Sequence, residues 1–179
     1  MEKQFLIAGF GGQGVLLIGQ LIAKAAMLEG NEVSWMPSYG PEMRGGEANC
    51  AVVVSDEQIG SPLVSEPPVL VVMNKPSLTK FMPKMPCNGT LLYNSSLIEG
   101  VEVRADIQAI PVPCNEIAER LGNERVANMV MLGAIQQVSG VCGDGSIHAT
   151  LVDWLGEKKA ALVDVNEQAV REGRAAVQA

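Results

Sequence analysis

Charged and aromatic residues are scarce in this sequence. Charged residues make up 18% of the 179 positions and aromatic residues only 4%. The 20 acidic residues outnumber the 13 lysines and arginines, which gives a formal net charge of −7. No basic run stands out, and binding to a phosphate backbone requires a basic surface. The composition therefore argues against nucleic acid as a partner.

Long apolar runs are also missing. No segment reaches the roughly 18 unbroken apolar residues that a membrane-spanning helix requires. The apolar start of the chain, up to Ala8, superficially resembles a signal peptide, but glycines from Gly9 onward interrupt it and no clear cleavage site follows. We therefore expect a cytoplasmic protein with no membrane partner.

The usual signatures of metal binding and catalysis are absent. The four cysteines are widely spaced and form no C-x-x-C pair, so no local iron–sulfur or zinc motif is present. We expect scattered buried thiols, although a metal site assembled from distant cysteines remains open. Walker A, H-E-x-x-H and G-x-S-x-G motifs are also missing. His148, the single histidine, is far in sequence from the glycine-rich segments, and we expect it on the surface or in helix packing. We therefore predict no metal ligand and no catalytic residue.

Apolar residues, in contrast, are abundant. They make up 47% of the sequence, and the mean hydropathy is +0.19. Two compatible explanations are a parallel sheet buried on both faces and a surface that a partner subunit covers. The length predicts a single domain over residues 1–179 with a sizeable core. An exposed partner surface would also allow the isolated chain to form a homodimer.

The apolar pattern predicts alternating strands and helices. A short apolar run at 4–8 indicates a buried strand, helical spacing follows from Val15 to Leu28, and Gly30 suits the helix C-terminus. A strand beginning at Val33 completes a strand–helix–strand unit, which favours a parallel sheet. The other expected strands are 51–54, 69–73, 90–93 and 110–112, and the other expected helices are 116–121, 125–138, 147–155 and 167–177. We predict an α/β, Rossmann-like three-layer domain with a mostly parallel sheet and a helical C-terminal part.

A glycine-rich segment lies between the first predicted strand and the first predicted helix. It reads GFGGQG from Gly9 and matches G-x-G-x-x-G in the structural context that this motif requires. Glycines allow a tight turn and close approach of the backbone, and a helix start offers free N–H groups to an anion. The candidate cofactor-binding residues here are Gly11, Gly12, Gln13 and Gly14. A tight strand–helix junction without a ligand is the alternative.

The second part of a dinucleotide fingerprint is not present. An NAD site has an acidic residue at the end of the second strand, where it binds the ribose hydroxyls. The only nearby acid is Glu32, which precedes that strand and lies at the wrong end of it. The glycine segment therefore favours a ligand other than NAD.

A second glycine-rich segment, SYGPEMRGGE from Ser38, follows the second predicted strand. Loops at the carboxyl ends of parallel strands meet at one sheet edge, so we expect both segments there. Arg44 could reach a phosphate or a partner's carboxylate, and Tyr39 offers a flat apolar face with a polar tip. We add Tyr39, Gly40, Arg44 and Gly45 to the candidate binding residues. An ordinary surface turn is the alternative.

Together these segments resemble the gamma subunit of the 2-oxoacid:ferredoxin oxidoreductases. The matching stretches are GFGGQGVLLIGQLIAKAA from Gly9, SYGPEMRGGEANCAVVVSDEQIGSP from Ser38, NKPSL from Asn74 and IAERLGNERVANMVMLGA from Ile117. The two glycine segments are far more specific in combination than either is alone. The chain looks closer to the 2-oxoglutarate, 2-ketoisovalerate and pyruvate types than to the indolepyruvate type.

The resemblance implies a subunit that is inactive alone. The family's enzymes convert a 2-oxoacid and coenzyme A into acyl-CoA and carbon dioxide and pass two electrons to ferredoxin. Thiamine diphosphate would be held by alpha and beta subunits, and iron–sulfur clusters by the beta or a delta subunit. This chain would hold no cofactor stably by itself, and its two glycine loops would help to bind or admit coenzyme A. A purely structural assembly subunit and a stand-alone dinucleotide-binding oxidoreductase are the alternatives.

Overall fold

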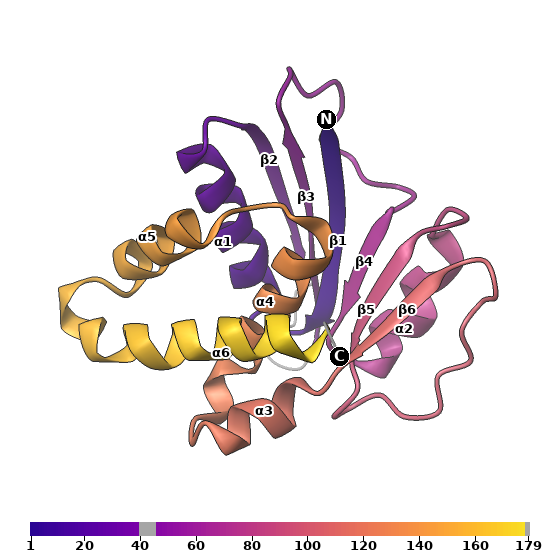
Figure 1. Cartoon of the computed structure of the whole chain (residues 1–179). Coiled ribbons are helices and arrows are strands. Elements are labelled where there is room, and N and C mark those ends of the chain that lie inside the picture. Colours follow the sequence, from indigo (N-terminus) through magenta and orange to yellow (C-terminus); the bar gives the residue numbers. More distant parts are fainter. Residues whose placement is uncertain (40–45, 178–179) are drawn as a thin grey trace.

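The computed structural model describes residues 1–39 and 46–177, which form a six-stranded sheet with helices on both faces (Figure 1). The strands are β1 (Glu2–Phe10), β2 (Glu32–Tyr39), β3 (Glu47–Ser55), β4 (Val69–Val72), β5 (Thr90–Asn94) and β6 (Gln108–Val112). The α-helices are α1 (Val15–Leu28), α2 (Lys75–Phe81), α3 (Cys114–Arg120), α4 (Ala127–Ser139), α5 (Asp144–Leu155) and α6 (Val163–Ala176). Short 3₁₀ segments are η1 (Met82–Lys84), η2 (Glu124–Val126) and η3 (Glu157–Leu162). No helix among these residues is both long and apolar enough to span a membrane.

The sheet order is β2-β3-β1-β4-β5-β6, and β3 is its antiparallel member. β1, β4, β5 and β6 pair in parallel. β1 and β2 both pair antiparallel with β3, so they run in the same direction but are not neighbours. The predicted strand–helix–strand unit and the mostly parallel α/β sheet are confirmed. The insertion of β3 between β1 and β2 was not predicted, because the apolar run at 51–54 does not reveal strand direction.

Alternate residues of the central strands face two different helical layers. On one face, Phe5 and Ile7 of β1 belong to a large core with residues of α1, α3, α4, α5 and α6. On the other face, Leu6 and Ala8 pack in a smaller core with residues of α2, η1 and the segment after β5. This period-2 alternation gives the predicted three-layer arrangement, with α1 and α2 on opposite sides of the sheet.

α1 forms over the predicted range because its local signals agree. Gly14 takes a left-handed conformation directly before it (φ 74°), and Gly30 does so after it (φ 83°). Ile18 and Ile22 are fully buried in the larger core. Apolar residues at this spacing place one helix face on the sheet, as the sequence predicts.

Two strands contain proline near the ends of the sheet. β2 continues through Pro37 to Tyr39 and so includes the first two residues of the second glycine-rich segment. The strand tolerates this proline because β2 is an edge strand, where one side of the backbone needs no ladder partner. β6, with Pro111, forms the opposite edge, where proline is likewise tolerated.

α4 and α6 cross with unusually close backbones. A Cβ atom added to Gly133 of α4 would overlap the Val170 carbonyl oxygen and lie 2.8 Å from its carbon. The relation is reciprocal, because a Cβ on Gly173 of α6 would overlap the carbonyl oxygen of Val130. α4 is thereby buried on several sides, as its apolar sequence predicts.

Candidate functional site

The two glycine segments begin at the same edge of the sheet. β1 and β2 run in the same direction and both end there, with Phe10 opposite Glu47 and Tyr39 opposite Ala48. The Gly11 N–H donates a hydrogen bond of 2.9 Å to the Gly46 carbonyl oxygen. The predicted convergence of the two segments is therefore confirmed where the chain is described. Tyr39 ends β2, whereas Gly40, Arg44 and Gly45 lie outside the described residues, so their roles stay predictions.

A pocket of about 640 Å³ opens beside the glycine loop, between the start of α1 and strands β2 and β3. Gly11, Gly12 and Gly14 line it on one side. Its other walls are largely apolar, with contributions from Val15, Leu16, Trp35, Pro37 and Ala48. Within the described residues, Glu47 is the charged side chain in the lining, and it forms an ion pair with Lys80. The pocket therefore combines a glycine backbone with an apolar interior.

The start of α1 offers backbone donors to this pocket. No side chain of the described residues caps the helix, and its first turn contains no acidic residue. The first helical hydrogen bond runs from Ile18 N–H to the Gly14 carbonyl oxygen, so the preceding N–H groups of the first turn have no helical acceptor. Gly12 adopts φ 103°, and an added Cβ would meet nothing within 4 Å. These features suit a closely approaching anion.

Two predicted donors of the loop are used inside the chain. The Gly11 N–H binds Gly46, and the Gln13 N–H donates to the Phe10 carbonyl oxygen at 3.1 Å. The Gln13 side chain is also engaged, since Oε1 accepts from the Phe10 N–H at 2.7 Å and Nε2 donates to the Met73 carbonyl oxygen at 3.1 Å. The backbone N–H groups of Gly12, Gly14 and the first turn of α1 remain as donors for a ligand.

Asn128 contacts the glycine loop, and the sequence analysis missed this contact. It lies in the first turn of α4 and is only 7% exposed. Its side chain packs on Gly14, where an added Cβ would lie 2.9 Å from the amide carbon. Its Oδ1 is buried and has no hydrogen-bond partner among the described residues. The available signal was an asparagine near the start of an otherwise apolar helix, where this polar residue is disfavoured.

The three buried thiols do not resemble nucleophiles. Burial raises the pKa of Cys50 and Cys142 to about 12, and it also raises the pKa of Cys114. These three are buried, as predicted, whereas Cys87 is exposed. A protonated buried thiol is a poor nucleophile and metal ligand. Over residues 1–39 and 46–177, no group of three His, Cys, Asp or Glu side chains could hold a metal ion.

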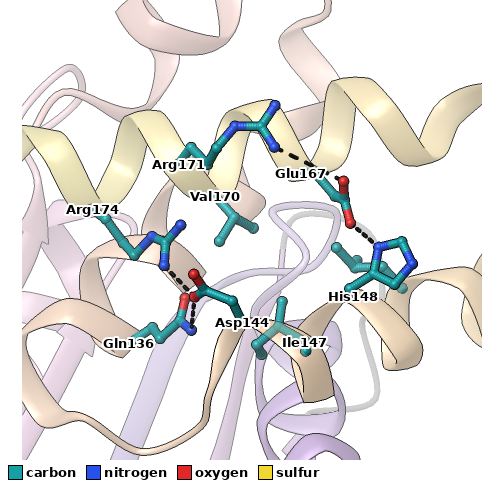
Figure 2. A pocket seen from close by; sticks show the side chains of 10 residues that line it. Gln136, Asp144, Ile147, His148, Glu167, Val170, Arg171 and Arg174 are labelled. Atoms are coloured by element: carbon teal, nitrogen blue, oxygen red, sulfur yellow. Dashed lines mark hydrogen bonds and ion pairs between the residues drawn. The ribbon is translucent and has the colours of Figure 1, made fainter.

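The histidine belongs to a separate pocket of about 350 Å³ between α5 and α6 (Figure 2). His148 of α5 is exposed and contacts Glu167 of α6, as Figure 2 shows. Asp144 of α5 likewise pairs with Arg174 of α6, and this hydrogen bond lowers the pKa of the Asp144 carboxyl group. The predicted surface or helix-packing role of His148 is confirmed, because both pairs join one helix to the other.

Comparison with known proteins identifies the family. Residues 4–176 match the family described as pyruvate ferredoxin/flavodoxin oxidoreductase. The chain belongs to this family. A relative within it, the ketoisovalerate oxidoreductase subunit VorA of Methanothermobacter thermautotrophicus, is 42% identical over 176 residues. The match covers 96% of this chain but 36% of VorA, so the chain spans about a third of that relative's length.

Solved structures of similar proteins have the same fold. The gamma subunit of a keto/oxoacid ferredoxin oxidoreductase from Geobacter sulfurreducens is 28% identical, with a TM-score of 0.83 and 98% of each chain covered. The 2-oxoglutarate:ferredoxin oxidoreductase of Magnetococcus marinus, solved with 2-oxoglutarate, coenzyme A and succinyl-CoA bound, has a TM-score of 0.92 at 24% identity. The match covers 99% of this chain and 31% of that one. The gamma-subunit resemblance and the Rossmann-like α/β fold of this pyruvate ferredoxin/flavodoxin oxidoreductase family member are thereby confirmed.

Proposed function

We propose that this chain is the gamma component of a 2-oxoacid:ferredoxin oxidoreductase and that its glycine-loop pocket binds coenzyme A. In this reaction a 2-oxoacid and the thiol of coenzyme A give acyl-CoA, carbon dioxide, a proton and two electrons, and the electrons reduce ferredoxin. Alpha and beta subunits, with a delta subunit in some assemblies, supply the rest of the enzyme. The proposal is supported by the similarity to the Geobacter sulfurreducens gamma subunit, in which 98% of each chain is covered.

The cofactors of the reaction are assigned to partner subunits. Thiamine diphosphate would supply the chemistry that breaks the bond between the keto carbon and the carboxylate carbon, and iron–sulfur clusters would carry the electrons. Cys50, Cys114 and Cys142 do not fit a cluster, because no group of three His, Cys, Asp or Glu side chains in residues 1–39 and 46–177 could hold a metal ion. This chain's residues are therefore proposed to bind and orient coenzyme A only.

The pocket beside the glycine loop is the observation that supports coenzyme A most directly. Coenzyme A has anionic phosphates and a long uncharged arm that ends in a thiol. The first turn of α1 provides N–H groups for a phosphate, and Gly12 allows close approach. The arm would lie along the apolar wall formed by Trp35 and neighbouring residues. A pocket with both properties fits a ligand with both parts.

The charge at the pocket rim is consistent with this ligand. Glu47 would repel a phosphate if its carboxylate were unpaired. Its ion pair with Lys80 of α2 offsets that charge. The rim is therefore compatible with an anion although the whole chain is acidic.

The decisive experiment compares two glycine substitutions in the assembled enzyme. Gly12→Val places a side chain at the pocket and strains the backbone at φ 103°, so we expect the Michaelis constant for coenzyme A to rise by about ten-fold or more. Gly30→Val is the matched control, because Gly30 also has positive φ (83°) and open space but lies at the other end of α1. Viologen reduction with a 2-oxoacid gives both kcat and the Michaelis constant. Arg44→Ala tests the sequence prediction for the second loop in the same assay.

The same variants separate the proposal from its alternatives. An unchanged Michaelis constant for coenzyme A in a correctly assembled Gly12→Val enzyme would exclude the coenzyme A role. Failure of Gly12→Val to assemble, with normal kinetics in the fraction that does, would instead favour a purely structural subunit. Titration of the isolated chain with NADH, followed by fluorescence, tests the stand-alone dinucleotide enzyme.

A further inference from the structure

The sheet of this protein has a topological switch point between β1 and β4. β1 leads into α1 on one face of the sheet, and β4 leads into α2 on the opposite face (Figure 1). In open α/β sheets, helices that diverge in this way leave a crevice outside the carboxyl ends of the strands, where ligands usually bind. The fold alone would therefore place a ligand between the starts of α1 and α2.

Two amide side chains cross this crevice. The Gln13 Oε1 accepts a hydrogen bond of 3.2 Å from Asn74 Nδ2, across 61 residues of sequence. Gln13 Nε2 donates to the carbonyl oxygen of Met73, the residue that follows β4. Asn74 Oδ1 in turn accepts from the Ser77 N–H at 2.9 Å and caps α2. The glycine loop is thus joined to the start of α2 by a chain of hydrogen bonds.

The first glycine of the motif makes room for this bridge. A Cβ atom on Gly9 would lie 2.7 Å from Gln13 Oε1 and 2.8 Å from Cγ1 of Val15. The amide of Gln13 therefore occupies the space where a side chain at the end of β1 would be. Beside it, the Met73 N–H donates to the Ala8 carbonyl oxygen at 2.9 Å. Protein atoms therefore fill the space between the carboxyl ends of β1 and β4.

We propose that Gln13 is a positioning residue that closes the switch-point crevice with Asn74. The closed crevice excludes a dinucleotide from its usual place. The anchored amide also holds the loop so that Gly12 and Gly14 line the pocket on the β3 side. Ligand binding is thereby displaced from the β1–β4 crevice to the space between α1, β2 and β3. The identity of the ligand as coenzyme A rests on the proposed function, whereas the bridge does not.

Asn74→Asp isolates the bond between the two amides. The new carboxylate can still accept from the Ser77 N–H, so the cap of α2 is kept, but it cannot donate to Gln13. In the assembled enzyme we expect the Michaelis constant for coenzyme A to rise about five-fold, as expected from losing one hydrogen bond, with kcat nearly unchanged. Hydrogen exchange of residues 10–15 should become faster, although the substitution lies in another segment.

Gln13→Ala removes the whole bridge and should give a larger rise in the Michaelis constant than Asn74→Asp. Gln137→Ala is its control, because Gln137 is an exposed glutamine of α4. We expect no kinetic change from the control. Gln13→Glu should restore neither the Michaelis constant for coenzyme A nor the slow hydrogen exchange of residues 10–15. Its carboxylate has no N–H group to donate to the Met73 carbonyl oxygen.

The outcomes separate this inference from the proposed function. Unchanged hydrogen exchange at residues 10–15 in Asn74→Asp would show that no bridge holds the loop. Faster exchange with an unchanged Michaelis constant would show that the bridge does not position the ligand site. Either result overturns the inference. If the wild-type assembly shows no dependence on coenzyme A, the proposed function fails, and the exchange measurement still decides whether the bridge exists.

Discussion

Two pairs of glycines serve opposite purposes in this protein. Gly12 and Gly14 lie in the loop before α1 with positive φ, and the space beside Gly12 is open. Gly133 and Gly173 lie inside α4 and α6, where the facing helix backbone occupies the position of a Cβ. The first pair supplies conformational freedom beside a pocket, and the second allows two helices to touch. The space beside Gly12 is open at the pocket, whereas the space beside Gly133 and Gly173 is filled by the backbone of the facing helix.

The largest effect is expected from Gly133→Ala. Its Cβ would overlap the Val170 carbonyl oxygen, which is backbone and cannot rotate away. Overpacking of this kind typically costs about 1–3 kcal/mol, and a backbone clash should reach or exceed about 3 kcal/mol. Urea unfolding measures the change. Gly145→Ala in α5 is the control, since its Cβ meets nothing within 4 Å and alanine favours the helix, so stability should rise slightly. Equal effects of the two substitutions would remove the proposed difference between the glycine pairs.

Gly14→Ala should have the next largest effect on stability. Its φ of 74° strains an alanine, and the new Cβ would also press on the amide of Asn128. We expect a loss of about 1–3 kcal/mol, the usual cost of a strained site. Adding Asn128→Ala should recover part of this loss, because the two changes share one contact. Thermal unfolding of both single variants and the double variant measures the coupling, and strict additivity would argue against the contact.

Gly12→Ala sharpens the comparison by separating strain from ligand contact. Gly12 and Gly30 both have positive φ and open surroundings, so alanine at either position should cost a similar amount, about 1 kcal/mol. Only Gly12→Ala should raise the Michaelis constant for coenzyme A. Parallel unfolding and steady-state kinetics test this. A kinetic effect from Gly30→Ala of the same size would show that backbone strain, rather than the pocket, is responsible.

The smallest effect on stability is expected from Asp144→Asn, which tests whether polar contacts also hold α6 in place. The Arg174 hydrogen bond lowers the pKa of Asp144 in the folded protein, so its stabilisation is present above the unfolded-state pKa and lost as pH falls through the folded-state pKa. Asp144 is largely exposed, so we expect a loss of about 0.5 kcal/mol at neutral pH, reduced further by salt. Urea unfolding at neutral and strongly acidic pH should show a difference only at neutral pH. A loss of stability as large as that of Gly133→Ala would contradict the view that the close contact between α4 and α6 stabilises this region more than the Asp144–Arg174 pair does.

Much of the fold could be predicted because its signals are local. α1 agrees with its predicted range, and the strands expected at 51–54, 69–73, 90–93 and 110–112 each overlap an observed strand. The convergence of the glycine segments followed from strand direction alone. The position of β3 could not be predicted, because the pattern of an apolar strand is the same in either direction. Asn128 was missed because no local motif relates it to the glycine loop.

The sequence by itself determined the glycine loop after β1, the helix α1 that follows it and the family to which the chain belongs. These depend on backbone freedom and apolar spacing, which act over a few neighbouring residues. Only the tertiary structure decided that Gln13 reaches Asn74, that Asn128 covers Gly14 and that α4 touches α6. These contacts join distant segments, and their energies depend on shape and hydrogen-bond geometry that exist only once the sheet has assembled.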